Sequence, residues 1–180
     1  MKKEKLTEKQ FILILDGPSC GGKTTAANMI LESFGGIFDA QSDRIKWLIS
    51  DYAADVYRDI VLEMTMEAVK IALKNGMSIL RQGAIYGKDE MLEVAREFDV
   101  PVFVANISAP KEVLDERFSE RIVAKKKGAK ISNVDPARFW ELCEMHNENK
   151  METPLEFDSS TQSPEEIACA IVRHIQENVK

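Results

Sequence analysis

The 180-residue sequence has few cysteines and no long apolar run. Its three cysteines lie far apart, at positions 20, 143 and 169, and form no CxxC pair. We therefore expect reduced thiols in a cytoplasmic protein. The apolar run at residues 11–15 is too short for a signal-peptide core or a membrane span, so no membrane partner is expected.

The sequence also lacks a basic excess. It has 24 Lys and Arg against 30 Asp and Glu, a net charge of −6, whereas proteins that bind duplex DNA non-specifically usually carry excess positive charge. Nucleic acid is therefore not the expected partner, although a local basic patch can still serve a small phosphorylated ligand. Length and composition suit one domain over residues 11–180, preceded by a disordered tail at residues 1–10.

Short apolar runs alternate with helical patterns along the chain. Strands are expected at residues 11–15, 37–40, 77–80, 102–106 and 155–157, and helices at 23–34, 44–49, 52–74, 88–98, 110–126, 135–149 and from 163 onward. This alternation predicts an α/β fold with a parallel sheet that helices cover on both faces. Ligands of such folds bind at the carboxyl ends of the strands.

A glycine-rich segment, GPSCGGKT at residues 17–24, follows the first expected strand and opens a helix. It matches the P-loop pattern G-x-x-x-x-G-K-[ST]. Small residues let backbone N–H groups surround a phosphate, the lysine reaches the β- and γ-phosphates, and the hydroxyl joins the Mg²⁺ shell. The residues expected to bind nucleotide are Gly17, Pro18, Ser19, Cys20, Gly21, Gly22, Lys23, Thr24 and Thr25.

Two classes of P-loop protein are disfavoured. A GTPase needs a base-reading Asn-Lys-x-Asp, and the nearest stretch, Asn149-Lys150-Met151-Glu152, ends in Glu and does not clearly follow a strand. A motor ATPase would have an apolar strand ending in Asp, whereas the strand at 77–80 is followed by Arg81-Gln82-Gly83.

Asp43 follows the second expected strand, in a loop that lies beside the P-loop in a parallel sheet. A kinase needs a carboxylate there to accept a proton from the attacking hydroxyl or to orient it. Asp43 could equally be the N-cap of the next helix, or favour its dipole while Ser42 caps it. The two roles are compatible.

Arg117 and Arg121 stand four residues apart and share one helix face. Lys125, Lys126, Lys127 and Lys130 follow in a glycine-interrupted segment. Such a run is either a solvated face or a mobile basic lid that covers the transferring phosphoryl group, which we place near residues 117–138.

At this point the chain resembles the P-loop small-molecule kinases, and SDRIKWLIS behind GPSCGGKTT is most similar to the zeta-toxin and chloramphenicol-phosphotransferase branch. The resemblance implies that Asp43 is the general base, that Arg117 packs against adenine and that Arg121 contacts phosphates. It also places the Asp158-Ser159-Ser160 turn near the adenine.

One feature departs from that branch. Many relatives carry Asp after strand three, where this chain has Arg81-Gln82-Gly83, so water, Asp39, Asp43 or the substrate must complete the Mg²⁺ shell. Arg81 itself either binds an anionic part of the substrate or is a surface arginine with a buried stem.

Other conspicuous residues have structural interpretations. Cys20 need only be small, and no catalytic role is expected for His146 or His174. Trp47 and Trp140 either line a substrate cleft or pack in the core, which is the commoner fate of aromatics at helical spacing.

Together these observations predict a three-layer α/β/α kinase, nucleoside-monophosphate-kinase-like, with strand order 2-3-1-4-5. We expect it to transfer the γ-phosphoryl group of ATP, with Mg²⁺, to a hydroxyl of a small molecule. A nucleotide-binding regulator or weak ATPase, and a polynucleotide 5′-hydroxyl kinase, are the alternatives. The sequence does not decide between monomer and dimer. The expected catalytic residues are Lys23, Asp43, Arg117 and Arg121; the substrate-binding ones are Asp43, Arg44, Arg81 and Gln82; and the metal ligands are Thr24 and Asp43.

Overall fold

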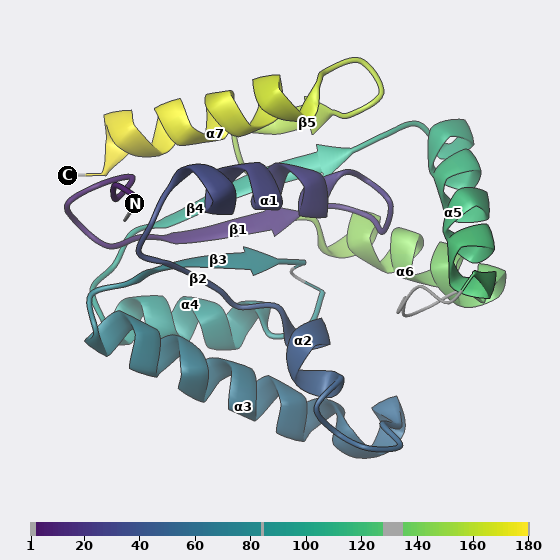
Figure 1. Ribbon diagram of the computed structural model, residues 1–180, viewed down its shortest axis with the longest axis horizontal. Coiled ribbons are helices and arrows are strands. Elements are labelled where there is room, and N and C mark those ends of the chain that lie inside the picture. The colour runs from purple at the N-terminus through teal and green to yellow at the C-terminus, as the bar shows by residue number, and fades with distance from the viewer. Residues whose placement is uncertain (1–2, 84, 128–134, 180) are drawn as a thin grey trace.

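Residues 3–83, 85–127 and 135–179, described by a computed structural model, form a three-layer α/β/α fold (Figure 1). The strands are β1 (Ile12–Asp16), β2 (Ile37–Asp39), β3 (Ser78–Gln82), β4 (Val102–Ser108) and β5 (Glu156–Asp158). The helices are α1 (Lys23–Ser33), α2 (Ser42–Lys46), α3 (Ala54–Lys74), α4 (Lys88–Glu97), α5 (Lys111–Lys126), α6 (Pro136–Asn149) and α7 (Pro164–Asn178). All strand pairs are parallel, in the order β2-β3-β1-β4-β5, which confirms the predicted fold and strand order.

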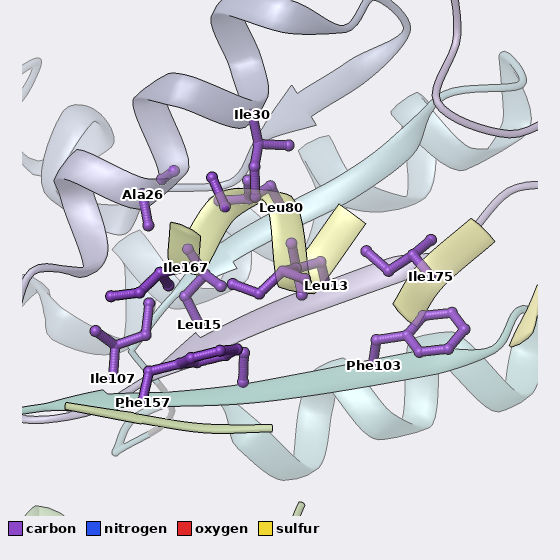
Figure 2. Close-up of a cluster of buried hydrophobic side chains, with 14 of the residues drawn as sticks. Leu13, Leu15, Ala26, Ile30, Leu80, Phe103, Ile107, Phe157, Ile167 and Ile175 are labelled. Carbon is purple, nitrogen blue, oxygen red and sulfur yellow. The ribbon is translucent and has the colours of Figure 1, made fainter. Parts of the chain in front are cut away.

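The central strand β1 is buried along its whole length. Because successive side chains of a strand point to opposite faces, Leu13 and Leu15 pack under α1 and α7, while Ile12 and Ile14 pack under α3 and α4 (Figures 1 and 2). Full burial of one such side chain contributes about 1.5–3 kcal/mol. Because both faces of β1 are buried, residues 11–15 of the sequence are all apolar instead of alternating with polar residues.

Strand β3 is longer than predicted. It continues through Arg81 and Gln82, because its pairing with β1 extends to the register Leu15↔Gln82 and Gly83 then donates its N–H to the Leu15 carbonyl. The sheet thus places two polar residues, which had been expected in a loop, directly beside the start of the P-loop.

The helix starts follow capping chemistry at two of three predicted sites. Asp135 accepts a hydrogen bond from the Ala137 N–H, and Ser163 forms a complete capping box with Glu166. At α2, however, the N-cap is Gln41, without a side-chain cap. The expectation that Ser42 or Asp43 caps this helix is therefore wrong, and Asp43 lies in the first turn, where the helix dipole favours a carboxylate.

The N-terminal residues pack against the amino-terminal end of the sheet. Leu6 is buried, Lys5 forms a bridge with Gly35, and the Gln10 amide donates to two backbone carbonyls. Residues 3–10 thus differ from the disordered tail expected for residues 1–10. Residues 128–134 of the expected lid, including Lys130, lie outside the described residues. No helix in the described ranges is long and apolar enough to cross a membrane.

Candidate active site

A cavity of about 1260 Å³ opens at the carboxyl end of the sheet, where α5 and α6 stand beyond the strand tips (Figure 1). One side of it is the P-loop with α5. A second part of the lining, here called the acceptor side, comes from residues within 41–62, from residues 81–83, 85 and 86, and from Arg138 and Leu142 of α6. The predicted nucleotide loop and the predicted substrate loop therefore face one space.

The P-loop connects β1 to α1 through positive φ angles at Gly17 (140°), Cys20 (64°) and Gly22 (104°). Gly22 is the N-cap of α1, without a side-chain cap hydrogen bond, and the first turn holds no acidic residue. Although the Thr25 N–H donates to the Gly22 carbonyl, no side chain caps this end of α1 in the described residues, and an anion is the ligand that a helix N-terminus favours.

Gly17 approaches the neighbouring strand closely. A Cβ built at this position would lie 2.0 Å from the Ile107 carbonyl oxygen. We expect Gly17→Ala to destabilise the protein more than Gly76→Ala. At Gly76 φ is also positive, but nothing lies within 4 Å of an added Cβ, so Gly76→Ala should cost only the backbone strain of about 1–2 kcal/mol. Urea denaturation of both variants tests this; equal losses would contradict the close packing of the loop against β4.

Lys23 turns back onto the P-loop. Its Nζ donates to the Gly17 carbonyl at 2.6 Å and to the Pro18 carbonyl at 2.7 Å. Burial lowers the pKa of Lys23 to about 8, against the opposing attraction of Asp16. When a phosphate enters the loop, the lysine ammonium can donate to phosphate oxygens in place of these two carbonyl oxygens.

Thr24 and Gln82 meet at the expected metal position. The Thr24 hydroxyl donates to the Gln82 Oε1 at 2.9 Å, so an amide oxygen of β3 lies beside this hydroxyl. No group of three or more His, Cys, Asp or Glu side chains that could hold a metal occurs among the described residues. A Mg²⁺ ion bound mainly by nucleotide phosphates and water needs only one or two protein oxygens, and Thr24 fits that requirement.

Two arginines of α5, Arg117 and Arg121, contact the P-loop. Arg117 donates to the Cys20 carbonyl and to both Ser159 Oγ and the Ser159 carbonyl at 2.8–3.2 Å. Arg121 donates to the Ser19 hydroxyl at 3.1 Å. Both arginines thus contact the P-loop from the helix face that their four-residue spacing predicted they share, and Arg117 also joins the loop to the β5–α7 turn.

Asp43 lies on the acceptor side, in the first turn of α2. Its carboxylate pairs with the Lys46 Nζ at 2.6 Å, yet the side chain stays 59% exposed, and Asp43 lines the cavity. Its neighbour Arg44 turns away and pairs with Asp39 at 2.9 Å. The two residues assigned to substrate binding in this loop thus separate, and only Asp43 lines the cavity.

Arg81 is buried, with 5% of its surface exposed. Its Nη1 donates to the Ala40 carbonyl and the Ser42 hydroxyl, and its Nη2 donates to the Tyr86 carbonyl. Burial lowers the pKa of Arg81, and the charges of Asp43 and Glu90 oppose that shift. The interpretation as a surface arginine is therefore wrong: the guanidinium ties both acceptor-side loops to the sheet and positions the segment that carries Asp43.

A sequence profile of chloramphenicol phosphotransferase-like proteins matches residues 10–176. The chain belongs to this family. As a member it is a P-loop phosphotransferase with a kinase fold. No curated protein sequence matches the chain significantly.

Solved structures share this fold at low identity. The tunicamycin resistance protein of Deinococcus radiodurans is 17% identical, with 96% of this chain and 98% of that chain covered, and a TM-score of 0.61. Shikimate kinase from Aquifex aeolicus is 15% identical, with 93% and 98% covered and a TM-score of 0.58. A chain of the Pnkp1/Rnl/Hen1 RNA repair complex is 17% identical, with 81% and 47% covered and a TM-score of 0.64.

Most residues that the sequence assigned to the site line the cavity of this chloramphenicol phosphotransferase-like protein. Pro18, Arg44 and Asp158 do not; the Asp158 carboxylate instead accepts bonds from the N–H and hydroxyl of Ser160. The lining members of the assigned set are Gly17, Ser19, Cys20, Gly21, Gly22, Lys23, Thr24, Thr25, Asp43, Arg81, Gln82, Arg117, Arg121 and Ser159. Trp47 also lines the cavity, whereas Trp140 packs edge-on against Phe139.

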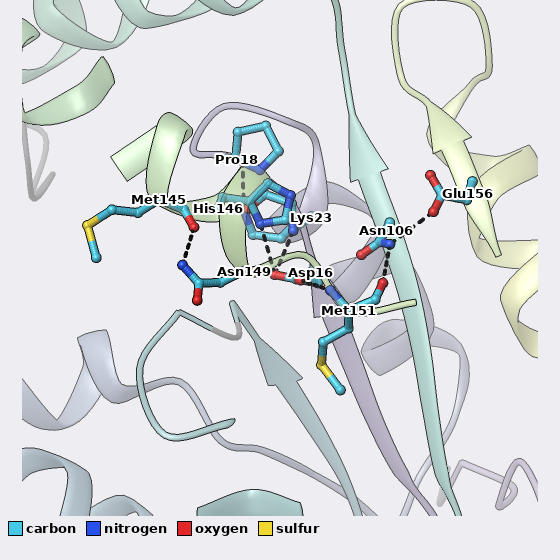
Figure 3. A network of polar contacts seen from close by, with 10 residues as sticks. Asp16, Pro18, Lys23, Asn106, Met145, His146, Asn149, Met151 and Glu156 are labelled. Atoms are coloured by element: carbon cyan, nitrogen blue, oxygen red, sulfur yellow. Dashed lines mark hydrogen bonds and ion pairs between the residues drawn. The ribbon is translucent and has the colours of Figure 1, made fainter. Parts of the chain in front are cut away.

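A buried pair, Asp16 and His146, lies behind the P-loop and was not predicted (Figure 3). The His146 Nδ1 lies 3.3 Å from Asp16 Oδ1, with exposed fractions of 4% and 1% for the two side chains. Burial raises the pKa of Asp16, but the hydrogen bond and charge of His146 and the N–H groups of Gly17 and Met151 hold it below its ordinary value. In the sequence, the only signal for this buried contact is that Asp16 immediately precedes the P-loop.

We expect His146→Leu to destabilise the protein by about 1–3 kcal/mol, because the buried Asp16 carboxylate loses a partner. Urea denaturation measures this. His174→Leu is the matched control, since His174 meets only an edge of Phe103 in the ring contacts. If the two variants are equally stable, the Asp16–His146 contact does not support the P-loop.

Proposed function

We propose that this family member transfers the γ-phosphoryl group of ATP to a hydroxyl of a small-molecule acceptor. The observation that carries the proposal is that the phosphate cradle and Asp43 line one and the same cavity. A cation-lined cradle facing a carboxylate is the arrangement that phosphoryl transfer to a hydroxyl requires.

ATP with Mg²⁺ supplies the phosphoryl group and the divalent cation when bound. Asp43 accepts the proton of the acceptor hydroxyl as the new O–P bond forms and the bond to ADP breaks. Lys23 and Arg121 neutralise the charge on the transferring group. Thr24 and Asp43 are the residues that would hold Mg²⁺, and Gln82 orients the Thr24 hydroxyl.

Arg117 and Ser159 hold the nucleotide side of the cavity in place, and we assign them to the adenine end. The expected lid near residues 117–138 belongs to this proposal, as does a single kinase domain over residues 11–180.

Two observations support the alternatives. Gln82 in place of a strand-three carboxylate favours a nucleotide-binding regulator or weak ATPase. The likeness to a chain of the RNA repair complex supports a polynucleotide 5′-hydroxyl kinase, against which the net charge of −6 counts.

Acceptor-stimulated ADP release separates the three proposals. The panel contains nucleosides, nucleotide sugars, antibiotics, sugars and 5′-hydroxyl oligonucleotides. Stimulation by a small hydroxyl compound, together with a phosphorylated product, supports the kinase. Stimulation by oligonucleotides alone overturns the small-molecule assignment, and nucleotide binding with a constant basal rate throughout favours the regulator.

A further inference from the structure

The cavity wall is positively charged in an acidic protein. The whole chain carries a net charge of −6, but the lining residues include seven Lys or Arg and two Asp. Three of the cations, Lys23, Arg117 and Arg121, belong to the nucleotide side. The acceptor side therefore keeps four cations against two carboxylates, and these six residues are Lys46, Arg58, Arg81, Arg138, Asp43 and Asp51.

Two of these cations meet at one tyrosine. The Arg58 guanidinium from α3 stacks over the Tyr86 ring at 4.9 Å from its centroid. The Arg138 Nη2 from α6 donates to the Tyr86 hydroxyl at 3.0 Å. Three segments far apart in the sequence thus bring two guanidinium groups onto a single side chain in the cavity wall.

Only one of these two charges has an ion-pair partner among the described residues. Arg138 pairs with Glu141 at 2.5 Å, whereas Arg58 forms no ion pair with any residue in the described ranges, where its contact is the Tyr86 ring. Like charges held close together repel each other, and the repulsion is relieved when an anion binds between them. Tyr86 keeps 37% of its surface exposed, so the place is open to a ligand.

The same side offers aromatic surface. Trp47 lines the cavity with 49% of its surface exposed, and Lys46 lies over its ring at 5.3 Å. Tyr52 and Leu62 also line this side. Aromatic and apolar walls with a few fixed polar groups are typical of sites for small molecules that contain a ring.

We propose that the acceptor is a small hydroxylated ring compound that carries a carboxylate or phosphate, and that Arg58 and Arg138 bind this anionic group beside Tyr86. The inference rests on the proposed function, whose acceptor class it names. Planar guanidinium groups suit both anions, because each can take two hydrogen bonds from one arginine.

The test measures binding rather than transfer. The protein is saturated with ADP and Mg²⁺, so that the P-loop is filled, and titrated calorimetrically with benzoate, phenyl phosphate and neutral benzamide at millimolar concentrations. ADP binding is recorded in the same series. Absence of ADP binding would contradict the proposed function. The difference in affinity between the anionic and neutral probes tests the acceptor class separately.

We expect at least one of the two anions to bind about tenfold or more tightly than benzamide, and the preferred anion identifies the group. Arg58→Gln and Arg138→Gln should each weaken that anion about tenfold, the effect of losing one charged hydrogen bond. Arg173→Gln, an exposed arginine of α7 away from the cavity, is the matched control and should bind like the wild type.

Three results would overturn the inference. The first is equal binding of anions and benzamide, or no binding of either anion. The second is an anion affinity that neither cavity variant changes. The third is a 5′-hydroxyl oligonucleotide that binds more tightly than phenyl phosphate and depends on Arg58, which would assign the pair to nucleic acid.

Discussion

Asp43→Asn is expected to lower acceptor phosphorylation by about 10²–10⁴-fold while the affinity for ATP stays within a few-fold of the wild type. Asparagine keeps the shape of the side chain but cannot accept the hydroxyl proton. The carboxylate lies on the acceptor side of the cavity, whereas the P-loop is the part expected to hold the nucleotide, so binding and transfer should separate. Single-turnover transfer to an identified acceptor and ATP titration measure the two quantities.

Asp59→Asn is the matched control for that substitution. Asp59 is an exposed residue of α3 outside the cavity lining, and its replacement makes the same change in net charge. Unchanged turnover of Asp43→Asn would remove Asp43 as the base. Equal losses in both variants would point to a general effect of charge on the acceptor rather than to proton transfer.

The fold and the nucleotide loop could be predicted because their signals are local. Apolar runs and helical spacing follow from backbone periodicity, and eight consecutive residues, 17–24, contain the whole P-loop pattern. The position of Asp43 was predictable for a related reason, since all strands of a parallel sheet end at the same edge, even though β3 lies between β2 and β1.

The remaining parts of the site depend on contacts between distant residues. His146 meets Asp16 across 130 positions, and the Arg58–Tyr86–Arg138 cluster joins α3, the β3–α4 segment and α6. The periodicity of apolar residues, which predicts helices and strands, gives no information about such long-range contacts. Arg81 misled the prediction because its charge suggested a surface, whereas three hydrogen-bond acceptors from two loops make its burial tolerable.

Arg81 also connects the acceptor side to the sheet. Ser42, immediately before Asp43, takes a hydrogen bond from Arg81 and lies 3.3 Å from the buried Thr65 hydroxyl. Asp43 is thus carried on a short helix, α2, whose first residue is fixed to β3 and α3, although its own side chain is exposed. A rigid support with an exposed carboxylate suits a group that must meet a mobile acceptor.

Lys23→Met is expected to lower transfer by about 10²–10³-fold, the usual effect of losing one group that stabilises transition-state charge. It should also weaken ATP binding, unlike Asp43→Asn. Without nucleotide, however, the variant should be at least as stable as the wild type at pH 7, because methionine removes a buried positive charge. Turnover, ATP titration and urea denaturation measure the three effects, with Lys74→Met, at the exposed end of α3, as the control.

The pH dependence of stability gives an independent check on Lys23. Its pKa is about 8 in the folded protein, against an ordinary value of 10.5. Between these values the unfolded chain binds more protons at this residue than the folded protein does, so the wild type gains stability as the pH rises. The stability advantage of Lys23→Met should therefore shrink from pH 8 to pH 10.5. An advantage that stays constant over this range would contradict the lowered pKa of Lys23. A variant less stable than the wild type at pH 7 would mean that the bonds from Lys23 to the Gly17 and Pro18 carbonyls outweigh the cost of its burial.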